Sequence, residues 1–138
     1  MKIRLLVLAL LFLPPAARGA DPEPGNWELT VTTQMDGMAQ PVGPIARTQC
    51  LTAADAQNPS KVLNPGSGSC EFTNRRESGA TYSFDVSCTG AFPMTGTGSV
   101  NYGTQSMSGE LHLASIVSGK KVGMDSRISG RRLGPCAQ

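Results

Sequence analysis

The chain has 138 residues, the length of a single domain, and a formal net charge of +2 at pH 7. Without Lys2, Arg4 and Arg18, nine basic residues face ten acidic ones, so the rest of the chain has a net charge of −1. This charge argues against a nucleic-acid-binding protein, which normally carries a basic face. The 16 glycines and 10 prolines, with frequent Ser and Thr, favour short strands joined by tight turns.

The N-terminus has the order of a secretory signal peptide. Two positive charges precede an unbroken apolar run from Leu5 to Leu13, and prolines and small residues follow it. The run is too short for a membrane span, which needs about 20 apolar residues. We expect cleavage after Gly19, which gives a signal peptide over residues 1–19 and one mature domain over residues 20–138. No other segment of the sequence is apolar enough to cross a membrane.

All four cysteines, Cys50, Cys70, Cys88 and Cys136, follow the expected cleavage site. An even number of cysteines behind a signal peptide indicates disulfides in an oxidising compartment. Zinc sites usually contain closely spaced cysteine pairs, and the long gaps here argue against one. We therefore expect two disulfides, no metal site and no cofactor.

The first half of the mature chain predicts two strands and one short helix. Apolar and polar residues alternate over residues 27–33, which is typical of a half-buried strand with Trp27 on its core side. A turn-rich loop over 35–44 leads to a second strand over 45–50. The spacing of a capping box at the following Thr and Asp predicts a helix over 53–57.

A hairpin is predicted around Ser78-Gly79-Ala80. A three-residue loop with Gly79 in the left-handed conformation places Phe72 opposite Val86, so that apolar residues share one face. A two-residue turn would instead place Phe72 opposite Asp85, so that the apolar residues would not share a face.

The same register places Cys70 opposite Cys88. Opposed residues have Cβ atoms about 4.5–5.5 Å apart, close enough for a disulfide after a small adjustment. Cys50–Cys136 then follows by elimination. The competing pattern, Cys50–Cys70 with Cys88–Cys136, stays open.

Three further strands are predicted over residues 95–102, 105–116 and 121–133. Turn signals at this spacing indicate an all-β fold, a small antiparallel meander that forms a strongly bent sheet or a small barrel. One short helix and two disulfides complete the expected fold.

The residues whose side chains could take part in catalysis do not form a catalytic pattern. His112 is the only histidine, and the sequence has no nucleophile motif to accompany it, so we expect a surface histidine. Gly96-Thr97-Gly98 lies inside a predicted strand, which excludes a phosphate loop and is typical of a bend or bulge. We therefore expect no catalytic residues and no enzyme.

Four segments resemble conserved motifs of a family of small exported proteins of Gram-negative bacteria, the domain of unknown function 3617. These are Pro24-Gly25-Asn26-Trp27-Glu28, Thr48-Gln49-Cys50-Leu51-Thr52 with Asp55-Ala56, Met94-Thr95-Gly96-Thr97-Gly98, and Ser129-Gly130-Arg131-Arg132-Leu133-Gly134-Pro135-Cys136. The resemblance spans nearly the whole mature chain and includes the four cysteines. It implies a periplasmic location but no established activity, ligand or catalytic residue.

These observations favour a non-enzymatic periplasmic module that binds a small ligand or an envelope protein. We expect Trp27, Met35 and Met38, at one end of the sheet and in the adjoining loop, to form the contact region. The alternative function is copper binding through the Met-rich loop, because thioether sulfur suits Cu(I). Methionines also fill cores flexibly, which is the plainer interpretation.

Overall fold

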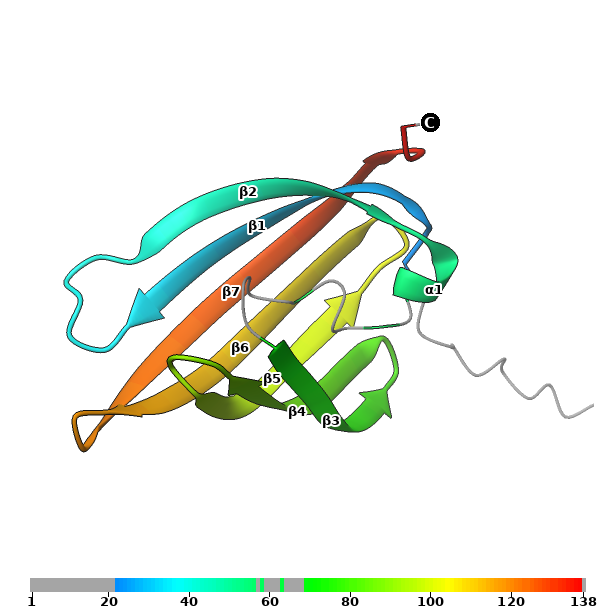
Figure 1. Ribbon diagram of the computed structural model, residues 1–138. Coiled ribbons are helices and arrows are strands. Elements are labelled where there is room, and N and C mark those ends of the chain that lie inside the picture. The colour runs from blue at the N-terminus through cyan, green and yellow to red at the C-terminus, as the bar shows by residue number, and fades with distance from the viewer. Residues whose placement is uncertain (1–21, 57, 59–62, 64–68, 138) are drawn as a thin grey trace, which may run out of the picture.

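Seven antiparallel strands form one continuous sheet in the computed structural model, which describes residues 22–56, 58, 63 and 69–137 (Figure 1). The predicted signal peptide lies outside these residues. The elements in chain order are β1 (Gly25–Met35), β2 (Val42–Leu51), α1 (Ala53–Ala56), β3 (Ser69–Ser78), β4 (Thr81–Thr89), β5 (Met94–Tyr102), β6 (Ser106–Val117) and β7 (Lys120–Gly134). The predicted strands are all present, most of them a few residues longer than expected.

The sheet is an open, bent sheet and not a barrel. Its strand order is β2-β1-β7-β6-β5-β4-β3, so β3 to β7 form a meander and the β1–β2 hairpin joins it through β7. β2 and β3 are the two edges and do not pair with each other. Figure 1 shows the sheet curling from β2 to β3, with α1 on its concave side.

Strict alternation separates an apolar concave face from a polar convex face. Along β1, Trp27 and Leu29 are buried on the concave side, whereas Glu28 and Thr30 lie on the convex side. Across the sheet, the buried apolar residues form one core cluster, which includes Trp27, Leu29, Leu51, Leu63, Phe84, Val86, Val100, Tyr102, Met107, Leu111, Leu113 and Ile128.

The helix α1 begins at the predicted capping box. The Thr52 hydroxyl accepts a hydrogen bond from the Asp55 amide at 3.1 Å, and the Asp55 carboxylate accepts one from the Thr52 amide at 3.1 Å. The helix covers Ala53–Ala56, and residue 57 lies outside the described residues. Leu51 before it and Leu63 after it are both buried and join the core.

The β3–β4 hairpin has the predicted pairing but not the predicted loop. Phe72 is opposite Val86 as expected, yet the connection is a two-residue turn, Gly79-Ala80, and the three-residue loop is wrong. A β-bulge in β3 supplies the extra residue, with Asn74 at φ 51°. Asn tolerates this left-handed conformation, which the sequence pattern alone did not signal.

Both disulfides match the pairing that the hairpin register favours. Cys70–Cys88 joins directly opposed residues of β3 and β4, whose Cα atoms are 4.0 Å apart. Cys50–Cys136 joins β2 to the segment after β7, with Cα atoms 5.4 Å apart. The competing pattern is therefore wrong.

Candidate functional site

An apolar groove of about 370 Å³ lies on the concave face and is lined mainly by β1, β2 and β7. Eight of its eleven lining residues are apolar, and its volume lies within the range of small-molecule sites. The lining residues are Leu29, Val31, Thr33, Ile45, Arg47, Leu63, Met94, Leu111, Met124, Ser126 and Ile128.

The pleat of β1 and the register of its two neighbours position these side chains. Val31 stands opposite Ile45 of β2 and Ile128 of β7, so three apolar side chains form one row across the groove. The next row pairs Thr33 with Ser126. Because side chains alternate with a period of two, each strand contributes every second residue to the groove.

The hydroxyls of the groove satisfy each other. Thr33 Oγ1 and Ser126 Oγ are 2.8 Å apart in a hydrogen bond, and Ser126 is buried. A buried polar group that is already paired does not need water. An apolar ligand can therefore contact this part of the groove without leaving the Thr33 and Ser126 hydroxyls without a hydrogen-bond partner.

Trp27 belongs to the core and lies away from the predicted loop. Its side chain is fully buried, and its indole Nε1 donates a hydrogen bond to the Glu23 carbonyl at 2.9 Å. Met35 lies at the opposite end of the same strand, roughly 27 Å away at 3.3–3.4 Å per residue. The three residues predicted as one contact region are thus not together: Met38 lies near Met35 in the turn after β1, where its amide donates to the Met35 carbonyl at 3.1 Å.

Strand register, and not only the loop after β1, determines which methionines lie close to each other. Met35 of β1 stands directly opposite Met124 of β7, and Met124 and Met94 both line the groove. Met107 is buried in the core. The sequence does not single out groove residues such as Ile45 and Leu111, because nothing local indicates which part of an apolar face stays uncovered.

His112 lies on the convex face among charged side chains. Its Nδ1 is 2.7 Å from Asp125 Oδ1, and its Nε2 is 3.8 Å from Glu110 Oε2. All three side chains are more than half exposed. Among the described residues, no group of three or more His, Cys, Asp or Glu side chains is arranged to hold a metal ion.

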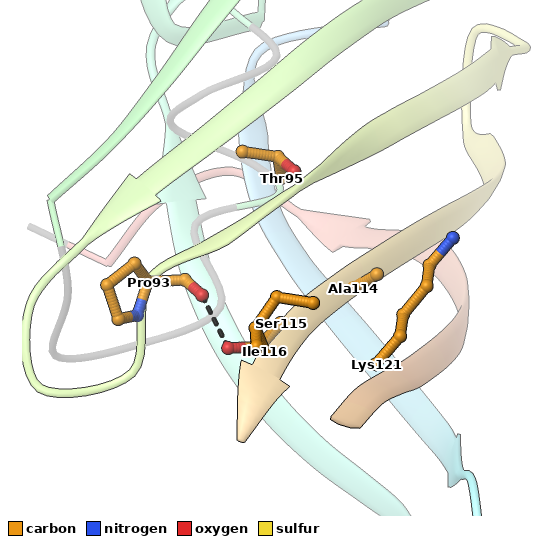
Figure 2. Close-up of a pocket in the computed structure, with 6 residues that line it drawn as sticks. All are labelled: Pro93, Thr95, Ala114, Ser115, Ile116 and Lys121. Atoms are coloured by element: carbon orange, nitrogen blue, oxygen red, sulfur yellow. Dashed lines mark hydrogen bonds between the residues drawn. The ribbon is translucent and has the colours of Figure 1, made fainter. Parts of the chain in front are cut away.

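A shallow second hollow lies between the β4–β5 turn and the ends of β6 and β7 (Figure 2). The Ser115 hydroxyl donates a hydrogen bond to the Pro93 carbonyl at 2.6 Å, which ties the turn to β6. Ile116 of β6 and Lys121 of β7 also line it (Figure 2). Because the Ser115 hydroxyl already donates its hydrogen bond to the turn, this hollow has fewer features of a ligand site than the groove.

The chain belongs to the family described as "protein of unknown function (DUF3617)", which it matches over residues 22–136. No curated protein and no solved structure matches the chain significantly. Within the described residues, no helix has the length and apolar character that crossing a membrane requires.

Proposed function

We propose that this member of the DUF3617 family is a non-enzymatic binding module that holds a small, largely apolar molecule in its concave groove. One observation carries the proposal: a groove with a mostly apolar lining stays open on the concave face, and its floor is formed by residues of the packed core. Concave sites lined mainly by apolar side chains with a few polar groups are typical of small-molecule binding.

The proposed place of action is the periplasm. The two disulfides support an oxidising compartment, since cytosolic thiols are normally kept reduced. Osmotic-shock fractionation of the native host, followed by the intact mass of the released protein, tests this. We expect a released protein that begins at Ala20 and has both disulfides formed; retention in the cytosol with residues 1–19 attached contradicts it.

Fluorescence of the neutral dye Nile red tests the groove. The matched variants are Ile45→Glu and Ala46→Glu in edge strand β2, since Ile45 lines the groove and Ala46 points to the other face. Ile45 is 60% exposed, so a charge there leaves the core intact. We expect the dye to brighten with wild type and Ala46→Glu but not with Ile45→Glu. Equal brightening with all three proteins, or none with wild type, contradicts the proposal.

Copper binding is a second candidate, and the pairing of Met35 with Met124 favours it. Two thioethers on adjacent strands, beside a groove that also contains Met94, offer ligands suited to Cu(I). Titration of Cu(I) in competition with a chromophoric chelator tests it. We expect Met35→Leu with Met124→Leu to lose binding, while Met107→Leu in the core keeps it; equal binding by both variants removes this candidate.

A further inference from the structure

We propose that the groove takes an anionic amphiphile, whose acidic end group binds Arg47 and whose apolar chain lies along the groove. This inference rests on the proposed binding function and names the class of ligand. It is carried by the position of a single charged side chain among otherwise apolar and hydroxyl lining residues.

Arg47 lies on the rim of the groove. It belongs to the edge strand β2, where it stands opposite Leu29 on the side of the sheet that forms the groove. Ile45, two residues away on the same face, is 60% exposed. An end group at Arg47 therefore stays near water, while a chain directed away from β2 reaches Val31 and Leu111.

The groove lining has a cation but no carboxylate. Two carboxylates outside the lining have partners of their own: Glu28 accepts a hydrogen bond from Arg131 at 2.9 Å, and Asp36 accepts one from the Gly123 amide at 2.7 Å. The charge of the lining is thus complementary to an anion.

The chemistry of Arg47 suits a carboxylate or phosphate end group. A guanidinium has five N–H donors in a planar fork, and it binds such groups with two parallel hydrogen bonds. Arg47 already takes part in an interaction within the protein, and five donors accommodate a second. The hydroxyls of Thr33 and Ser126 are bonded to each other, so the floor favours the chain over the end group.

Isothermal titration with dodecanoate and 1-dodecanol, both below their aggregation concentrations, separates the end group from the chain. The variant Arg47→Met removes the charge and keeps a long apolar stem. Arg127→Gln is the control, because Arg127 is 87% exposed on the convex face.

We expect wild type and Arg127→Gln to bind dodecanoate about tenfold or more tightly than dodecanol, as for a hydrogen bond to a charged group. Arg47→Met should bind the two within about threefold of each other, with its affinity for dodecanol unchanged. Added salt should weaken only the dodecanoate binding of wild type and control.

Equal affinity of wild type for both probes overturns the anionic end group and leaves the groove as a site for neutral molecules. A preference for dodecanoate that survives in Arg47→Met, or an equal loss of both probes in that variant, also overturns it. If wild type binds neither probe, and Nile red does not brighten, the proposed function fails as well.

Discussion

Gly98 of β5 and Phe84 of β4 are directly paired across the sheet, and the phenyl ring fills the space above the glycine. A Cβ at Gly98 would lie 2.5 Å from Phe84 Cε2 and 2.6 Å from Leu111 Cδ2. Phe84 is almost fully buried, so the ring has no solvent space to move into. The absence of a side chain at Gly98 is therefore part of the core packing.

We predict that Gly98→Ala lowers the free energy of unfolding by about 1–3 kcal/mol, because the added methyl overpacks the core. Alanine usually stabilises a strand relative to glycine, so the sign of the effect is diagnostic. Urea denaturation measures it. The control Thr97→Ala, on the convex face between the two glycines, should stay within about 0.5 kcal/mol of wild type; a Gly98→Ala protein as stable as this control contradicts the prediction.

The sequence predicts a bend or bulge within a strand at Gly96-Thr97-Gly98, and the strand is confirmed. The bulge is wrong, because β5 pairs with β4 and β6 here without a register shift. The reason for the glycines is close approach: a Cβ at Gly96 would collide with the backbone carbonyl of His112 in β6. Such contacts depend on the neighbouring strands and not on the local sequence.

In the hairpin of β3 and β4, the sequence pattern predicts the pairing but not the loop. Matching apolar faces predicted the pairing of Phe72 with Val86, and with it the disulfides, because side-chain period and register are coupled. The loop was wrong because a bulge at Asn74 compensates for the shorter turn. A two-residue turn with a bulge and a three-residue loop without one give the same pairing of Phe72 with Val86. The apolar pattern therefore cannot distinguish the two.

The candidate site was harder to predict than the fold. Alternation in β1 indicated correctly that Trp27, Leu29 and Val31 share a face. It did not indicate which part of this face is packed and which part lines an open groove. That difference depends on packing between elements that are distant in the sequence, which the pattern within β1 does not report.

The two disulfides should stabilise the domain to different extents. We predict that Cys50→Ala with Cys136→Ala lowers the free energy of unfolding by about 4.6 kcal/mol, because the bond closes a loop with a separation of 86 residues. For Cys70→Ala with Cys88→Ala, with a separation of 18 residues, chain entropy alone gives about 3 kcal/mol.

Urea denaturation of the three proteins without reductant measures both losses. The larger loss should be accompanied by a larger urea dependence of the unfolding free energy, since a chain free of the long crosslink exposes more surface. A protein without Cys50–Cys136 that is as stable as wild type contradicts the prediction.

Tyr102 provides a prediction about alkaline stability. Its hydroxyl is buried without a hydrogen-bond partner among the described residues, and burial raises its pKa from about 10 to about 12. Below pH 10 the phenol is neutral in both folded and unfolded states. Between pH 10 and 12 the unfolded state loses its proton first, so stability should fall by about 1.4 kcal/mol per pH unit.

We predict that Tyr102→Phe is as stable as wild type at pH 7, or about 1 kcal/mol more stable, since it removes an unsatisfied buried hydroxyl. The ring contact with Tyr82, at 5.5 Å between centroids, is retained. Above pH 10 the unfolding free energy of Tyr102→Phe should not show the decrease that ionisation of Tyr102 causes. The control Tyr82→Phe should still show this decrease. Urea denaturation at pH 7, 10 and 11 measures this, and parallel pH profiles for wild type and Tyr102→Phe would show that the phenol ionises equally in both states.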